Sequence, residues 1–161
     1  MRLVLQRVRR ASVVVGGEQV AAIGRGLVAL VGVRRGDTDA AAKQLAKKAV
    51  ELRVFDDAAG LMNRSLIEAG GELLAVSQFT LYADMRRGRR PSFVEAAPAA
   101  EAAPLFEAFC RAVEEAGVVC RRGVFGAEML VELVNDGPVT IILDSQELAR
   151  PRRQRNHVEE P

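Results

Sequence analysis

The sequence predicts one domain of the mixed α/β class. Its length of 161 residues suits a single core, and the shares of apolar residues (49%) and charged residues (27%) are those of a soluble globular protein. Short apolar runs bounded by turn residues alternate with two longer amphipathic segments, which is the pattern of strands and helices within one domain.

Four strands are predicted in the first part of the chain. Residues 1–8 roughly alternate apolar and polar side chains, as a half-buried strand does. Residues 12–15 and 19–23 flank a Gly-Gly pair, which is a hairpin signal. Residues 27–33 form a continuous apolar run that is typical of a buried strand.

Two helices are predicted, and each has an apolar stripe. The first begins where Asp37 or Thr38 can cap free backbone N–H groups, and it places Leu45, Ala49 and Leu52 on one face. The second covers about residues 99–116 and ends at a glycine. Its apolar stripe consists of Leu105, Phe106, Phe109 and Val113.

The remaining strands are predicted at residues 72–80, 118–121, 130–134 and 139–143, with a turn at residues 56–60. The element order is therefore β-β-β-β-α-β-α-β-β-β, in a domain that covers residues 1–145. Beyond this point the chain becomes polar and rich in Pro and Arg, so residues 146–161 are interpreted as a mobile tail.

Composition excludes several kinds of site. His157 is the only histidine and lies in the tail, so a Ser-His-Asp or Cys-His site is not expected. Cys110 and Cys120 with one histidine cannot form an ordinary zinc site, and the sequence contains no Gly-rich nucleotide loop. We therefore expect no metal and no organic cofactor.

The sequence also predicts a cytoplasmic location. The N-terminus lacks the apolar segment of a signal peptide. No apolar run reaches the ~20 residues that span a bilayer, so no membrane partner is expected.

Arginines gather at residues 86–90 and 150–155. Such clusters are typical of proteins that bind a polyanion, but they also occur in solvated loops and disordered tails. The net charge of +2 does not separate these interpretations.

Two segments are polar where a strand should be apolar. Residues 77–82 read S-Q-F-T-L-Y, and residues 135–140 read N-D-G-P-V-T. The hydroxyls of the first segment can be hydrogen-bonded at a strand end. A Gly-Pro pair between strands normally indicates a tight turn, and X-Pro is also the peptide bond for which the cis form costs least.

These segments resemble the S-Q-F-T-L and N-x-G-P-V-T signatures of the D-aminoacyl-tRNA deacylase family. Further matches follow in the expected order and spacing, at residues 6–8, 60–63, 87–93 and 123–129. The similarity spans about residues 1–145 of the chain, whereas the tail has no counterpart in the family.

The resemblance implies a mixed, barrel-like sheet and a homodimer. It implies hydrolysis of the ester between a D-amino acid and the 3′-terminal adenosine of tRNA. Gly137-Pro138 would be a cis peptide that enters the partner's site, where its backbone collides with an L side chain but does not fully reject glycyl-tRNA.

The same resemblance implies a set of site residues. The catalytic residues would be Ser77, Gln78, Phe79 and Thr80. Substrate binding and chiral selection would fall to Arg7, Phe125, Met129, Gly137, Pro138, Val139 and Thr140. Arg86, Arg87, Arg89 and Arg90 would contact tRNA phosphates. Arg7 would hold the Gly-Pro motif, and Phe125 and Met129 would line an adenine pocket, although both can also be ordinary core residues.

Two nucleophiles are considered for the implied site. Thr80 has no evident base beside it, so water assisted by the ribose 2′-hydroxyl is favoured over a threonine nucleophile. Backbone N–H groups near Phe79 and Thr80 are candidates for an oxyanion hole. A non-catalytic tRNA-binding module remains the alternative, because the arginine clusters suit it although the scarcity of aromatic residues does not.

Overall fold

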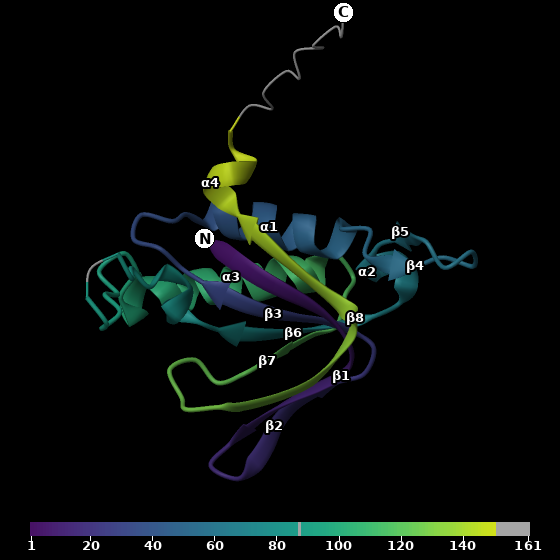
Figure 1. Cartoon of the computed structure of the whole chain (residues 1–161), viewed down its shortest axis with the longest axis horizontal. Coiled ribbons are helices and arrows are strands. Elements are labelled where there is room, and N and C mark those ends of the chain that lie inside the picture. Colours follow the sequence, from purple (N-terminus) through teal and green to yellow (C-terminus); the bar gives the residue numbers. More distant parts are fainter. Residues whose placement is uncertain (87, 151–161) are drawn as a thin grey trace, which may run out of the picture.

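A computed structural model describes residues 1–86 and 88–150. These residues form a mixed, barrel-like sheet and two long helices, as the sequence predicts. The two long helices lie on one face of the sheet (Figure 1). No helix within the described ranges is long and apolar enough to cross a membrane.

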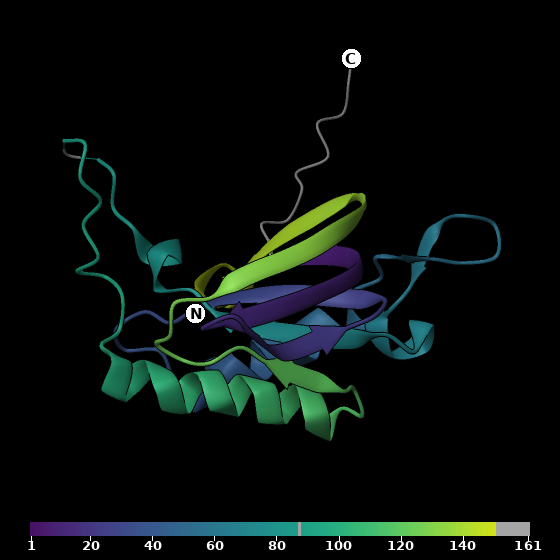
Figure 2. The same cartoon turned by 90° about the horizontal axis from the view of Figure 1, so that it is seen from below.

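The main sheet has the strand order β2-β1-β3-β6-β7, and β8 pairs with the free edge of β1. Its strands are β1 (Arg2–Val15), β2 (Glu18–Ile23), β3 (Gly26–Gly32), β6 (Glu72–Ser77), β7 (Cys120–Arg122) and β8 (Leu130–Asp144). The first half of β1 pairs with β3 and its second half with β2, while β8 follows β1 along nearly its whole length. The antiparallel pair of β1 and β8 therefore curls over the parallel strands, as Figure 2 shows.

The long helices α1 and α3 cover the opposite face of the parallel strands. The helical elements are α1 (Asp39–Glu51), α2 (Leu66–Ala69), η1 (Phe79–Tyr82), α3 (Ala99–Glu115) and α4 (Ser145–Leu148). As predicted, Thr38 caps α1, where its side chain accepts a hydrogen bond from the backbone N–H of Ala41. Gly117 adopts a φ of 84° directly after α3, a conformation that stops a helix and favours glycine.

Two apolar clusters hold these layers together. The larger lies between the sheet and the helices and includes Phe55, Phe106 and Phe109, all fully buried. The smaller lies inside the curl of the sheet and centres on Val8, Val13 and other branched side chains. A small hairpin of β4 (Phe55–Asp56) and β5 (Met62–Arg64) projects beside α2.

Three predicted element boundaries are wrong. The strands predicted at 1–8 and 12–15 are one continuous strand, β1, and those predicted at 130–134 and 139–143 are one strand, β8. The strand predicted to reach residue 80 ends at Ser77, where the 3-10 helix η1 replaces it. In each case pairing with segments remote in sequence decides the boundary.

The chain beyond the predicted boundary at residue 145 begins as the short helix α4, in which Leu148 packs against the larger cluster. Residues 151–161 lie outside the described residues, so the mobile tail stays a prediction.

Candidate functional site

The candidate site begins where β6 ends. Ser77 lies beside Val31 of β3, and the backbone N–H of Gln78 donates to the Val31 carbonyl oxygen at 2.8 Å. The chain then turns into η1, which lies directly over Gly32. A Cβ atom at that glycine would come within 3.0 Å of the Leu81 Cβ atom. The glycine therefore allows η1 to sit close against the sheet.

Two backbone donors are available at the start of η1. The first N–H groups of a helix have no acceptor within it. No described residue accepts a hydrogen bond from the N–H of Phe79 or of Thr80. The side-chain amide of Gln78 donates to the Thr80 hydroxyl and so holds that side chain beside the two N–H groups. This geometry is suited to an oxygen that carries negative charge.

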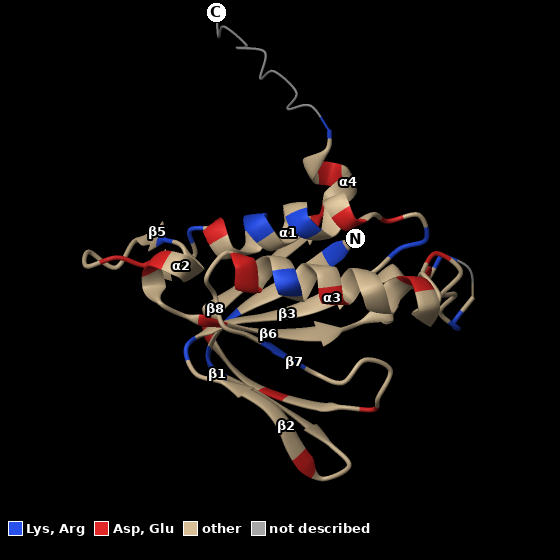
Figure 3. Ribbon diagram, turned by 180° about the vertical axis from the view of Figure 1, so that it is seen from behind, with Lys and Arg blue, Asp and Glu red and all other residues tan. Residues whose placement is uncertain are grey.

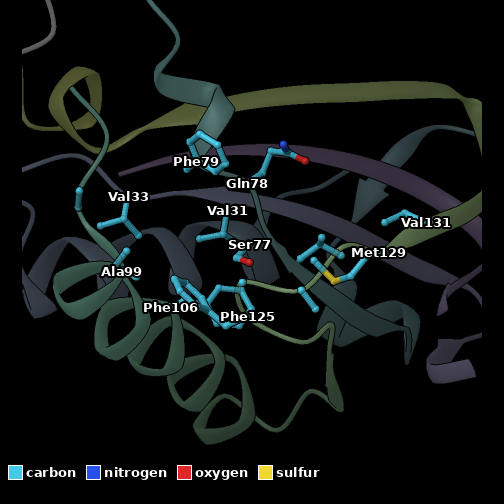
Figure 4. Close-up of a pocket in the computed structure, with 15 residues that line it drawn as sticks. Val31, Val33, Ser77, Gln78, Phe79, Ala99, Phe106, Phe125, Met129 and Val131 are labelled. Atoms are coloured by element: carbon cyan, nitrogen blue, oxygen red, sulfur yellow. The ribbon is translucent and has the colours of Figure 1, made fainter. Parts of the chain in front are cut away.

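A pocket of about 390 Å³ opens beside these donors. Residues from the ends of β3 and β6, from η1, from the start of α3 and from the segment that leads into β8 line it: Val31, Val33, Val76, Ser77, Gln78, Phe79, Ala97, Ala99, Ala102, Phe106, Phe125, Gly126, Ala127, Met129 and Val131. Figure 4 shows Phe79 and Gln78 on one side of the pocket and Phe106 and Phe125 on the other. The size and apolar lining suit a small organic ligand.

Phe125 and Met129, both predicted site residues, line this pocket. The ring of Phe125 meets that of Phe106 with centroids 6.0 Å apart. The Met129 thioether lies over Gly123, where a Cβ atom would come within 2.6 Å of the Met129 Sδ atom. Both side chains are half-buried and pack against the two apolar clusters, so they combine a core role with a pocket wall.

Small side chains at the start of α3 make room for the pocket, and they are not among the predicted site residues. Ala97, Ala99 and Ala102 form part of its wall. The alanine-rich run at residues 96–103 is visible in the sequence and could have indicated a surface that leaves space for a ligand.

None of the residues that line the pocket carries a side chain that ionises near neutral pH. Tyr82, at the end of η1, has a shifted pKa. Burial, followed by the charges of Asp37 and Asp144, raises the pKa of its hydroxyl above the usual value. Among the described residues, no group of three or more His, Cys, Asp or Glu could hold a metal ion.

The second polar segment forms a protruding bulge in β8. Gln6 of β1 faces Thr140 and Val8 faces Asn135, so Arg7 alone is opposite the four residues 136–139. The Gly137-Pro138 peptide is cis, and both residues are exposed. The sequence pattern of a tight turn between two strands is therefore realised as a bulge within one strand.

Buried and polar side chains fix this bulge. The Arg7 guanidinium, which is buried, donates from Nε to the Asp136 carbonyl oxygen at 2.8 Å and from Nη1 to the Val54 carbonyl oxygen at 2.6 Å. Arg7 Nη1 also lies 3.1 Å from Asp56 Oδ1. The Val139 backbone N–H donates to Asn135 Oδ1 at 3.0 Å, which closes the bulge from its other side.

One chain does not bring the two polar segments together. Ser77 is level with Val31 of β3, whereas the bulge is level with Leu27, four residues earlier on the same strand. Three strand spacings separate β6 from β8, so the segments lie roughly 20 Å apart. In Figure 1 the bend of β8 and the carboxyl end of β6 are at opposite ends of the sheet.

The arginine loop extends from η1 toward α3. Arg86 is paired with Asp84, with Nη2 and Oδ2 2.7 Å apart, and this contact lowers the pKa of the Asp84 carboxyl to about 2. Arg89 and Arg90 are exposed, and no described acid pairs with either. Arg87, also predicted to contact phosphate, lies outside the described residues.

Comparison with known proteins gives close matches along most of the chain. A family model described as D-Tyr-tRNA(Tyr) deacylase matches residues 4–144. The D-aminoacyl-tRNA deacylase of Thermomicrobium roseum is 60% identical over 148 residues, which are 92% of this chain and 96% of the relative. That of Roseiflexus castenholzii is 58% identical over 154 residues, 96% of this chain and 98% of the relative.

Solved structures show the same fold. A protein titled c-Myc DNA Unwinding Element Binding Protein superposes with a TM-score of 0.85 at 41% identity, covering 89% of this chain and 98% of its own. A probable eukaryotic D-amino acid tRNA deacylase shares the fold with a TM-score of 0.75 at 21% identity. The match covers 88% of this chain and 97% of that protein's chain. The family model and the relatives together show that this chain belongs to the D-Tyr-tRNA(Tyr) deacylase family.

Proposed function

We propose that this chain is a D-aminoacyl-tRNA deacylase whose active site is completed by the Gly137-Pro138 bulge of a second copy. The observation that carries the proposal is the pairing of an apolar pocket with two free N–H donors at one end of the sheet, while a rigid exposed bulge lies at the other end. Because one chain keeps these parts roughly 20 Å apart, a homodimer is the arrangement that joins them.

The pocket takes the terminal adenosine of the tRNA. Phe106, Phe125 and Met129 offer the aromatic and thioether surface on which a purine packs. With the base held there, Ser77 and Gln78 lie at the pocket edge where the ribose and its ester emerge. The ester carbonyl then lies next to η1.

The N–H groups of Phe79 and Thr80 stabilise the charge that develops on the ester carbonyl oxygen, an effect typically worth about 3–4 kcal/mol. Water attacks the carbonyl carbon, the bond to the ribose 3′ oxygen breaks, and a proton passes to that oxygen. The pocket lining supplies no ionisable base, which supports assistance by the neighbouring ribose 2′-hydroxyl over a Thr80 nucleophile.

The bulge of the second copy selects the D enantiomer by exclusion. Its backbone lies against the α-carbon of the aminoacyl group, so an L side chain collides with it and a D side chain points away. Glycine has no side chain to exclude, so mischarged glycyl-tRNA is also a substrate. The close approach requires a residue without a Cβ atom, which Gly137 provides.

The activity is tested by measuring single-turnover hydrolysis of D-Tyr-tRNA, L-Tyr-tRNA and glycyl-tRNA. We expect fast release of D-Tyr, slower release of glycine and little release of L-Tyr. Equal rates for both enantiomers would exclude chiral selection. Binding of tRNA with no hydrolysis of any ester would support the tRNA-binding module instead.

The cross-subunit arrangement is tested by mixing two defective variants. Ala127→Trp fills the pocket, and Gly137→Leu places a side chain on the bulge. If the site is shared, a heterodimer contains one site made from the two intact parts, and co-refolded mixtures regain activity. If each chain carries its own complete site, every chain has a defect and the mixture stays inactive.

A further inference from the structure

An exposed aromatic pair lies beside the pocket. The rings of Phe79 and Phe93 meet edge to face, with centroids 4.9 Å apart and planes inclined by 72°. Phe79 is 55% exposed and Phe93 is 37% exposed. Of the other phenylalanines, Phe55, Phe106 and Phe109 are fully buried and Phe125 is half-buried. This pair therefore presents most of the protein's exposed phenylalanine surface.

The backbone holds Phe93 firmly although its ring is exposed. Immediately before it, Ser92 exchanges two hydrogen bonds with Asp84, of 2.8 and 3.0 Å. The carbonyl oxygen of Phe93 accepts a hydrogen bond from the N–H of Ala96 at 3.0 Å. The ring is thus positioned in advance and loses little conformational entropy when a ligand packs on it.

The aromatic pair adjoins one edge of the pocket. Phe79 lines the pocket, and its ring stands at the pocket edge opposite Phe106 and Phe125 (Figure 4). A ligand that places its terminal group in the pocket and continues as a chain therefore passes along Phe79 toward Phe93. The aromatic pair forms one side of this exit.

Basic side chains lie at the same end of the molecule. Arg35 donates from Nε to the carbonyl oxygen of Val94, the residue after Phe93, at 2.9 Å. No described acid forms an ion pair with Arg35, Arg89 or Arg90. Figure 3 shows the basic residues of the β3–α1 connection and of the arginine loop at the same end of the molecule. Aromatic rings with unpaired arginines are the combination that binds single-stranded nucleic acid.

We propose that Phe79 and Phe93 form a stacking subsite for the nucleobase that precedes the terminal adenosine of the tRNA. This inference rests on the proposed function, because the terminal adenosine must occupy the pocket. One ring offers its face to the unpaired base and the other supports it edge-on, while the arginines meet the adjoining phosphates. The subsite recognises any base by its flat surface.

The test compares two substrates with different lengths of RNA. D-Tyr-tRNA carries the preceding nucleotide, whereas the D-Tyr ester of adenosine does not. In Phe93→Leu, which keeps an apolar side chain, we expect the ratio of kcat/KM for the tRNA to kcat/KM for the adenosine ester to fall roughly tenfold, because stacking is lost only with the tRNA. Val94→Ala, which shortens the neighbouring exposed side chain, is the matched control and should keep the ratio.

A direct readout accompanies the kinetics. Uncharged tRNA with 2-aminopurine at the penultimate position should lose fluorescence on binding the unaltered protein, and this loss should be smaller with Phe93→Leu. An unchanged kinetic ratio together with unchanged quenching would overturn the subsite. Failure of the unaltered protein to hydrolyse either ester would instead refute the proposed function, and the quenching would still report on the aromatic pair.

Discussion

Arg7 and Asp136 are 129 positions apart in the chain, yet Arg7 Nε donates to the Asp136 carbonyl oxygen at 2.8 Å. The same guanidinium donates to the Val54 carbonyl oxygen, in the segment that connects α1 to β4. One buried cation therefore joins the bulge of β8 to this segment. We expect Arg7→Ala to lower the free energy of unfolding by about 2–4 kcal/mol, since one buried and one part-buried carbonyl oxygen lose a charged donor.

The same substitution should impair selection between enantiomers, because the bulge loses its anchor. We expect the ratio of D-Tyr-tRNA to L-Tyr-tRNA hydrolysis to fall in Arg7→Ala under conditions where the protein remains folded. Urea unfolding measures the stability, and single-turnover assays measure the ratio. A folded variant that kept full selectivity would show that Arg7 is not needed for the orientation of the bulge.

Thr80→Ala should keep substantial activity, because the hydroxyl is not the nucleophile in the proposed chemistry. A D-aminoacyl-tRNA that ends in 2′-deoxyadenosine should react poorly with the unaltered protein. Both are measured as single-turnover rate constants at saturating protein. Loss of activity in Thr80→Ala with full-speed hydrolysis of the deoxy substrate would reverse the assignment and favour a covalent threonine intermediate.

Gly26 lies where β3 approaches the start of β6, and a Cβ atom there would come within 1.8 Å of the Glu72 carbonyl oxygen. Gly26→Ala should therefore destabilise the protein by about 3 kcal/mol, because the two parallel strands must separate. Gly24→Ala is the control, since its Cβ would meet only the end of the Glu72 side chain at 3.8 Å. Its effect should stay within about 0.5 kcal/mol in urea unfolding.

Arg89 and Arg90 should strengthen tRNA binding without reading sequence. For the double substitution to alanine, we expect a higher KM and a shallower salt dependence, with the slope of log(kcat/KM) against log salt concentration reduced by roughly 1–2. The control removes the same charge at Lys47 and Lys48 on the exposed side of α1. An equal loss of slope in both variants would indicate a general charge effect rather than contacts from the loop.

Asp84 should titrate near pH 2 in the folded protein, because its hydrogen bonds to the Arg86 side chain and backbone lower the pKa of its carboxyl from 3.8. The pKa of the Asp84 carboxyl is lower in the folded state than in the unfolded state. The contact therefore contributes its full stabilisation of the folded state above about pH 4, and this stabilisation is lost as the pH falls toward 2. Carboxyl NMR of the folded protein measures the midpoint. In Arg86→Ala the midpoint should rise toward 3.8, and an unmoved midpoint would exclude Arg86 as the cause.

Local sequence patterns were enough to predict the two long helices and the apolar strands of the sheet. The stripe of Leu45 and Ala49 and the cap at Thr38 are local features, and local periodicity predicts α1 because its backbone hydrogen bonds join residues four apart. The signatures at residues 77–81 and 135–140 also singled out the segments that contain η1 and the cis Gly137-Pro138 peptide.

The conformation of those segments depends on the tertiary structure. Residues 135–140 read as a turn locally, but pairing with β1 makes them a bulge within one strand, and Arg7 fixes it from far along the chain. The same applies to the pocket wall at Ala97, Ala99 and Ala102, and to the pairing of Phe79 with Phe93. These features depend on contacts between segments remote in sequence, which no local pattern encodes.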